Sequence, residues 1–193
     1  MGSTYKEIPH CAWLCLWGYG HEQSTLRGFS RESTTRHVAK SREEASLLGI
    51  QTAFLSHSHL DHELAIGLQN LLVEEGWSVY IDWQDHSLPS SPNGHTAAFI
   101  RLKIKVLDWF LFLVTENSKN SKWCPWELGF ADGVKDNSRV LVIPTSDAYG
   151  KTHGNEYLEI YRRLDVGSSP SRSGYAVFKP SATNGVWIEN LKF

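Results

Sequence analysis

The stretch FLSHSHLDHE, residues 54–63, joins an apolar run to a segment with helical spacing. Ala53–Ser56 predicts a short strand, and leucines then recur at three- and four-residue steps until Gly76, where a helix would end. These leucines are Leu60, Leu64, Leu68, Leu71 and Leu72. The stretch therefore predicts a strand followed directly by an amphipathic helix, which is half of a βαβ unit.

The same alternation continues along the chain. Further short apolar runs predict strands, and segments with helical spacing separate most of them. The predicted strands are Trp77–Asp82, Asp108–Thr115, Arg139–Pro144 and Tyr175–Lys179, the predicted helices are Ala97–Val106, Pro125–Val134 and Glu156–Leu164, and Gly167–Gly174 is a predicted loop. Strands that alternate with helices favour an α/β fold built on a parallel sheet with right-handed crossovers.

A binding site is expected at one edge of this sheet, because ligands of open parallel sheets bind beyond the carboxyl ends of the strands. Three segments emerge there: Ser56–His57, the loop 83–95, and the turn from Trp123 to Glu127. The loop is too long to serve as a simple connector, and loops of that length are commonly functional.

The composition and net charge of the chain limit the partners and the cellular setting that can be expected of it. The chain has 193 residues, a formal net charge of −2 and 21% charged residues, which gives no reason to expect nucleic acid or a membrane surface as a partner. Its three cysteines, Cys11, Cys15 and Cys124, lack a Cys-x-x-Cys pair and suit reduced thiols in the cytoplasm. No run approaches the roughly 20 apolar residues of a membrane helix.

The first 50 residues lack the alternation of apolar runs and helical spacing that the rest of the chain shows. They are polar and irregular, and only Ser41–Leu48 predicts a short helix. We therefore expect an N-terminal extension over residues 1–50 and one domain with a C-terminal extension over residues 51–193. The apolar patch around Trp13 and Trp17 is expected to pack against that domain or a neighbouring subunit.

The opening stretch also contains His57-x-His59-x-Asp61-His62, a spacing similar to the metal-binding motif of metallo-β-lactamases. Such residues can hold zinc and lower the pKa of a bound water. The context argues against this hydrolase alternative, because the 50 residues upstream contain few strands and the remaining histidines fall in turn-rich loops. No metal is expected.

Three segments instead resemble TIR (Toll/interleukin-1 receptor) domains, in the same order and over about 130 residues. Phe54–Asp61 resembles their opening motif. Trp77–Asp82, followed by a loop with Leu88–Pro89, resembles the second box and its long loop. Ser121–Gly129 resembles the segment that carries Trp-x-x-x-Glu in enzymatic members, here Trp123 and Glu127. The resemblance implies a flavodoxin-like five-stranded parallel sheet with helices on both faces.

Enzymatic members of this family cleave the bond between nicotinamide and ribose in NAD+, so the resemblance implies NAD+ as substrate and no cofactor. It implies Glu127 as the catalytic residue. The residues implied to bind substrate are Phe54, Ser56, His57, Asp82, Trp83 and Trp123. It also implies an ADP-ribose-derived signal in bacterial antiphage defence, a separate effector protein that senses this signal, and a homo-oligomer.

Each of these residues could also serve a purely structural role. A glutamate in the first turn of a helix is favoured by the helix dipole, Ser56 could cap the following helix, and tryptophans such as Trp123 commonly pack in cores. If the helix starts at Pro125, Trp123 precedes it, so a helical face shared with Glu127 cannot be assumed. The alternative for the whole chain is a non-catalytic TIR adaptor that acts by TIR–TIR association.

Overall fold

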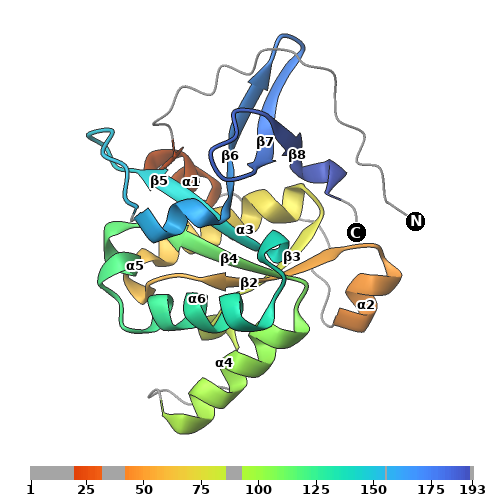
Figure 1. Ribbon diagram of the computed structural model, residues 1–193, viewed down its shortest axis with the longest axis vertical. Coiled ribbons are helices and arrows are strands. Elements are labelled where there is room, and N and C mark those ends of the chain that lie inside the picture. The colour runs from red at the N-terminus through yellow and green to blue at the C-terminus, as the bar shows by residue number, and fades with distance from the viewer. Residues whose placement is uncertain (1–19, 32–41, 86–92, 155, 192–193) are drawn as a thin grey trace.

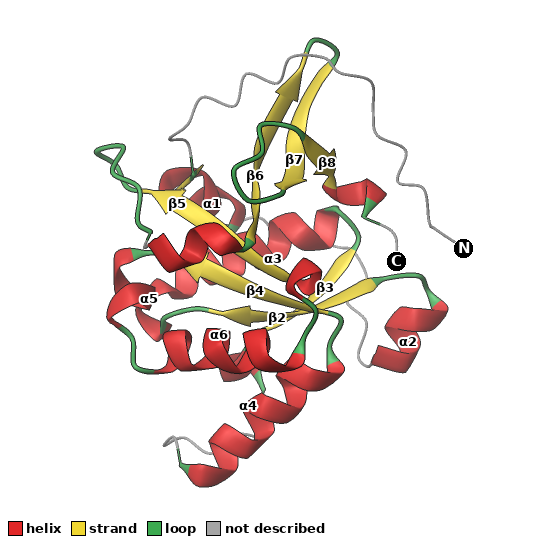
Figure 2. Ribbon diagram, in the orientation of Figure 1, coloured by secondary structure: helices red, strands yellow, loops and turns green. Residues whose placement is uncertain are grey.

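Five parallel strands form the centre of the sheet in the computed structural model, which describes residues 20–31, 42–85, 93–154 and 156–191 (Figures 1 and 2). In spatial order they are β3 (Trp77–Tyr80), β2 (Gln51–Ser56), β4 (Trp109–Val114), β5 (Val140–Ser146) and β6 (Arg162–Ser169). Counted along the chain, this is the order 2-1-3-4-5 of flavodoxin-like folds. The predicted fold class is confirmed.

Alternate residues of the strands feed two separate cores. Leu55 and Leu111 point to a core shared with α1 (Gln23–Phe29) and α3 (His62–Glu74). Phe54 and Phe112 point to the other core, shared with α4 (Gly94–Val106) and α6 (Trp123–Val134). Because strand side chains alternate in direction, the uninterrupted apolar runs place helices on both faces of the sheet (Figure 2).

The predicted first helix forms as α3 and ends where expected. Gly76 has a φ of +84°, a left-handed conformation that glycine adopts without a steric penalty, and its N–H donates to the carbonyl of Val73. The chain reverses there and enters β3 next to β2. The first βαβ unit is therefore built as the sequence indicates.

The C-terminal part corrects three predictions. Glu156–Leu164 is not one helix, because a short 3₁₀ helix, η4 (Glu156–Ile160), is followed by β6. The predicted strand at Tyr175 lies in β7 (Arg172–Phe178), which pairs antiparallel with β6 and with β8 (Gly185–Trp187). The predicted loop Gly167–Gly174 is mostly strand, because its residues pair with one another across the end of the β6–β7 hairpin and only 170–171 form the turn. β6 is the fifth parallel strand.

Part of the predicted N-terminal extension is built into the fold. β1 (His21–Glu22) pairs parallel with the end of β5, and Leu26 of α1 is completely buried. A Cβ added to Gly67 of α3 would lie 1.8 Å from the carbonyl oxygen of Leu26, so α1 crosses α3 at a point where only glycine fits. The predicted helix at Ser41–Leu48 is confirmed as α2 (Arg42–Leu47).

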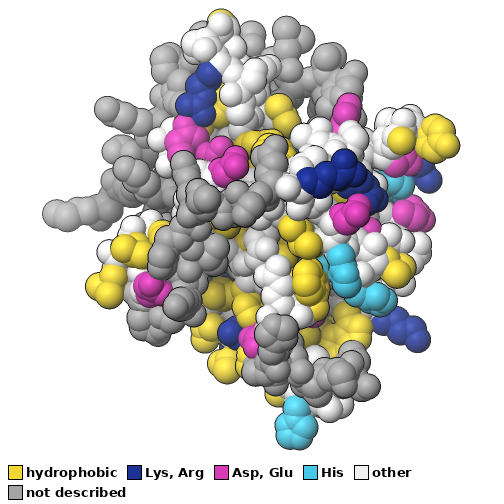
Figure 3. Space-filling model, turned by 180° about the vertical axis from the view of Figure 1, so that it is seen from behind, with side chains coloured by type: hydrophobic (Ala, Val, Ile, Leu, Met, Phe, Trp, Pro, Cys, Tyr) yellow, Lys and Arg dark blue, Asp and Glu magenta, His cyan; other side chains and the backbone are white. Residues whose placement is uncertain are grey.

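Short elements complete the described chain. They are η1 (His59–Asp61), η2 (Asp82–Gln84), α5 (Glu116–Asn120), η3 (Asn137–Arg139) and η5 (Ile188–Asn190). Within the described ranges, no helix is long and apolar enough to cross a membrane. Acidic and basic side chains of the described residues are interspersed on the face seen in Figure 3. The predicted packing of Trp13 and Trp17 lies outside the described residues.

Candidate active site

The candidate active site is built on one short hydrogen bond between β2 and α6. Ser56 is the last residue of β2, and its Oγ donates to Glu127 Oε2 at 2.6 Å. Ser56 follows Phe54 by two residues and so faces α6, as Phe54 does. Both partners are buried, with 1% of Ser56 and 5% of Glu127 exposed. The two residues are 71 positions apart in sequence, and the parallel fold brings them together at the carboxyl edge of the sheet.

Helix α6, which carries Glu127, begins earlier than predicted. Its first residue is Trp123 instead of Pro125, and Ser121 Oγ accepts the N–H groups of Trp123 and Cys124 at 3.1 and 3.3 Å. Pro125 is tolerated because the first-turn N–H groups have no partner inside the helix. Trp123 and Glu127 are therefore four residues apart on one helix, and the prediction that Trp123 precedes the helix is wrong.

Burial changes the ionisation of Glu127. It raises the pKa of this carboxyl from 4.5 to about 7, since a charge is poorly solvated there. The hydrogen bond from Ser56 favours the carboxylate and acts in the opposite direction, while the negative charge of Asp82 raises the pKa further. A buried carboxyl that titrates near neutral pH at a sheet edge is typical of a functional site.

Cys124 is a neighbour of this pair that the sequence did not single out. It is completely buried one turn before Glu127, and burial raises the pKa of its thiol to about 12, so the thiol stays protonated at neutral pH. The hydroxyl groups of Ser121 and Ser56 favour the thiolate and partly oppose this rise in pKa. The sequence contains no signal for it, because Cys124 precedes the predicted helix Pro125–Val134; in α6 it lies three residues before Glu127, so both side chains share one face.

His57, Asp82 and Trp83 form the next part of the site. The indole Nε1 of Trp83 donates to His57 Nε2 at 3.0 Å, and His57 Nδ1 lies 3.2 Å from the carbonyl oxygen of Leu55. Asp82 Oδ1 accepts the backbone N–H of Trp83 at 2.8 Å. Burial lowers the pKa of His57, and the negative charge of Asp82 opposes this effect. These contacts fix the turn after β3 against the end of β2.

Two predicted substrate-binding residues lie in different surroundings. The Phe54 ring is 1% exposed and stacks between Tyr80 and Phe110, with centroids 5.8 Å away in both cases. Phe54 therefore supports Ser56 from the core and presents almost no surface to a ligand. Trp123 is half-buried and packs edge to face against Trp126 at 5.4 Å. Residues 86–92 of the predicted loop, with Leu88 and Pro89, lie outside the described residues.

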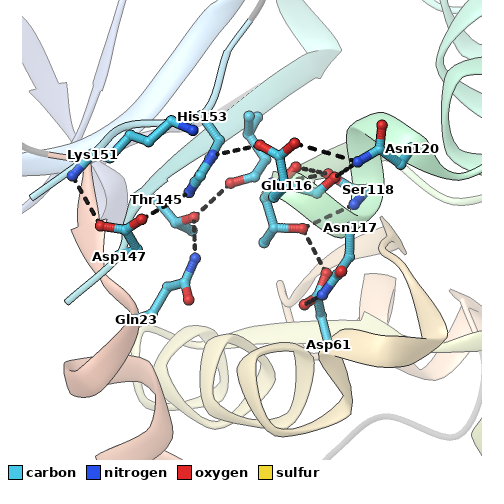
Figure 4. A network of polar contacts seen from close by, with 12 residues as sticks. Gln23, Asp61, Glu116, Asn117, Ser118, Asn120, Thr145, Asp147, Lys151 and His153 are labelled. Atoms are coloured by element: carbon cyan, nitrogen blue, oxygen red, sulfur yellow. Dashed lines mark hydrogen bonds and ion pairs between the residues drawn. The ribbon is translucent and has the colours of Figure 1, made fainter. Parts of the chain in front are cut away.

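The residues of the predicted zinc alternative have other partners. Asp61 is buried and accepts hydrogen bonds from Thr115 Oγ1 at 2.6 Å and Asn117 Nδ2 at 2.7 Å, as Figure 4 shows. His59 is exposed on η1, and the ring of His62 stacks on Trp83 at 4.8 Å. Among the described residues, no group of three or more His, Cys, Asp or Glu is arranged to hold a metal ion.

A polar network fixes the same sheet edge from the side of α1 and α3 (Figure 4). Thr145 Oγ1 donates to the carbonyl of Val114 at 2.6 Å and accepts from Gln23 Nε2 at 3.2 Å. His153 Nδ1 lies 3.1 Å from Glu116 Oε2. The ends of β4 and β5 are thus tied to each other and to the N-terminal segment, which gives the site a rigid base.

Known proteins match the same part of the chain. Residues 53–167 match the sequence profile of the TIR domain. A protein of Bacillus cereus (strain MSX-D12) named "Probable 3' cyclic ADP-D-ribose synthase ThsB'" is 39% identical over 121 residues, which are 62% of this chain. The chain spans 63% of the length of that relative. Ser56, Trp83 and Glu127 all fall inside the segment that matches the profile.

Proposed function

Because this chain belongs to the TIR domain family, we propose that it is an NAD+-cleaving enzyme that makes an ADP-ribose-derived signalling nucleotide. The observation that carries the proposal is the hydrogen bond of 2.6 Å from Ser56 to the buried carboxyl of Glu127. The name of the Bacillus cereus relative supports a cyclic ADP-ribose as the product class.

The chemistry suits a buried carboxylate. The bond between C1′ of ribose and the pyridinium nitrogen breaks, and both electrons leave with nicotinamide, which becomes neutral. Positive charge then develops on the ribose as an oxocarbenium ion, and a negative group fixed beside it lowers the barrier. The ionised form of Glu127 supplies that charge. The acceptor that attacks C1′ is water, an atom of the same molecule when the product is cyclic, or another small nucleophile.

Surrounding residues have supporting roles in this proposal. Ser56 stabilises the carboxylate form of Glu127 and holds its orientation. Trp83 and Trp123 offer flat aromatic surfaces to the rings of the dinucleotide, which stack well on indole. His57 and Asp82 hold the turn that carries Trp83. Phe54 contributes by filling the core below Ser56.

We further propose a setting for the reaction. The enzyme works in the cytoplasm as a homo-oligomer, and a separate effector protein senses its product during antiphage defence. NAD+ is the substrate and no cofactor takes part. The support for this setting is the similarity to a named nucleotide synthase.

Purified protein incubated with NAD+ tests the proposal. Wild type is expected to release nicotinamide, and Glu127→Ala is expected to lose roughly a hundredfold or more in kcat, the usual effect of removing an electrostatic stabiliser. Glu159→Ala is the matched control, because Glu159 is an exposed glutamate on η4, which precedes β6 and lies at the opposite sheet edge. Mass spectrometry of the nucleotide identifies the product.

Two outcomes would contradict the proposal. Equal turnover by wild type and Glu127→Ala would remove Glu127 from the reaction. No nicotinamide release by wild type at high protein concentration would favour the adaptor function, in which TIR domains only associate.

A further inference from the structure

Trp83 is an exposed aromatic residue that is nevertheless held on three sides. It retains 39% of its surface, yet one face of its indole stacks on His62 at 4.8 Å with an interplanar angle of 28°. Its indole N–H donates to His57, and its backbone N–H donates to Asp82. An exposed indole is ordinarily free to change rotamer, so these contacts mark a side chain whose orientation is fixed.

His57 has both ring nitrogens engaged within the protein. The indole N–H of Trp83 can only donate, so His57 Nε2 must accept and the ring proton resides on Nδ1. That proton points to the carbonyl oxygen of Leu55, 3.2 Å away. In this arrangement His57 has no ring nitrogen left for a substrate.

We propose that His57 is a positioning residue that acts through Trp83: its Nε2 accepts the indole N–H and holds the indole plane, at the sheet edge where Ser56 contacts Glu127, as a stacking surface for a planar base of the dinucleotide. This inference rests on the proposed function for the identity of the ligand. The contact between His57 and Trp83 itself does not depend on that function.

The location of Trp83 makes this role useful. Trp83 directly follows Asp82, whose charge acts on both His57 and Glu127, so the turn after β3 lies within electrostatic reach of the buried carboxyl. His57 directly follows Ser56, the hydrogen-bond partner of Glu127. Two consecutive residues at the end of β2 thus orient the site. Ser56 holds the carboxyl of Glu127, and His57 holds the indole of Trp83.

Nuclear magnetic resonance of ¹⁵N-labelled protein tests the contact without any turnover. The indole resonance of Trp83 is identified as the one missing from Trp83→Phe. In His57→Ala this resonance is expected to move to the position of an indole N–H that is bonded only to water. His59→Ala, which removes an exposed histidine two residues further on, is expected to leave it in place. An unchanged Trp83 resonance in His57→Ala would overturn the inference.

A double-mutant cycle tests the role. Loss of one hydrogen bond is expected to raise KM for NAD+ roughly three- to tenfold in His57→Ala and in Trp83→Phe, with kcat nearly unchanged. The double variant is expected to resemble the more affected single variant, because both changes remove the same contact. His57→Gln, whose amide can both donate and accept, is expected to restore part of the lost affinity.

The outcomes separate this inference from the proposed function. Effects that multiply in the double variant, or a large fall in kcat when His57→Ala is made in the Trp83→Phe background, would show that His57 acts on the substrate directly. If wild type releases no nicotinamide, the proposed function fails, and the resonance of Trp83 still decides whether His57 holds the indole.

Discussion

Replacing Glu127 by glutamine should make the protein more stable at alkaline pH while abolishing turnover. Glutamine keeps the size of the side chain and can accept the hydrogen bond from Ser56, but it cannot ionise. Burial raises the pKa of Glu127 from 4.5 to about 7, so the folded protein holds this proton more tightly than the unfolded chain does. The stabilising effect of the bound proton is complete below pH 4.5 and is lost as the pH rises through about 7.

The size of the effect follows from the two pKa values. Their separation of about 2.5 pH units corresponds to about 3 kcal/mol at 1.36 kcal/mol per unit. This is a large share of the roughly 5–15 kcal/mol that stabilises an ordinary domain. Wild type should therefore lose about 3 kcal/mol relative to Glu127→Gln between pH 4.5 and pH 8.

Urea denaturation of both proteins at several pH values measures the difference. Comparing the two curves cancels the contribution of groups that titrate in both proteins. One such group is His21: burial lowers its pKa to about 4, so its contribution to stability has the opposite sign. A free-energy difference that stays constant from pH 4.5 to pH 8 would refute the reasoning, because Glu127 would then ionise in the folded protein as it does in the unfolded chain.

Three further predictions concern neighbouring features. Ser56→Ala removes a hydrogen bond that favours the carboxylate, so the pH of half-maximal nicotinamide release should rise by roughly one unit; an unchanged pH–rate profile would contradict this. Gly67→Ala should cost roughly 2–4 kcal/mol in urea denaturation because its Cβ would collide with backbone, whereas Gly28→Ala, with open space around it, should be neutral or slightly stabilising. Asp61→Ala should cost roughly 1–3 kcal/mol by leaving buried hydrogen-bond donors without their acceptor, and an unchanged urea midpoint would count against that network.

The centre of the sheet could be predicted because its strands are uninterrupted apolar runs. Trp109–Val114 is buried at every position, and a run of that length bounded by polar residues is typical of a strand covered on both faces. β6 escaped prediction for the opposite reason. Its sequence carries charges at Arg162, Arg163 and Asp165, so the local pattern over Glu156–Leu164 favours a helix over a strand. Pairing with β5 and β7 overrides that local preference.

The N-terminal segment with β1 and α1 could not be predicted because its local sequence shows no clear strand or helix pattern. β1 has two residues and α1 has seven, too few for periodicity to stand out. Tertiary contacts hold these two elements in place. The buried ring of His21 lies 3.2 Å from the carbonyl oxygen of Leu164 and stacks on Tyr175. Both partners are far away along the chain, Leu164 by 143 positions, and no window of sequence contains that information.

The proximity of Ser56 and Glu127 could be predicted in part. The rule that ligands bind at the carboxyl ends of parallel strands put both segments at one edge, and the resemblance to TIR domains selected the residues. The rule could not show that the two side chains share a hydrogen bond. The tie between His57 and Trp83 was also beyond prediction, since it depends on the conformation of the turn after β3.

The close crossing of α1 over α3 bears on how this protein should be cut for expression. A fragment trimmed to the matched residues 53–167 would remove Leu26 from its position over Gly67, unpair the end of β5 and cut β6 two residues before its end. Such a fragment would expose apolar surface at both ends and would be prone to aggregate. An expressed chain that begins before Gly20 and continues to Leu191 keeps every described segment that packs against the two cores.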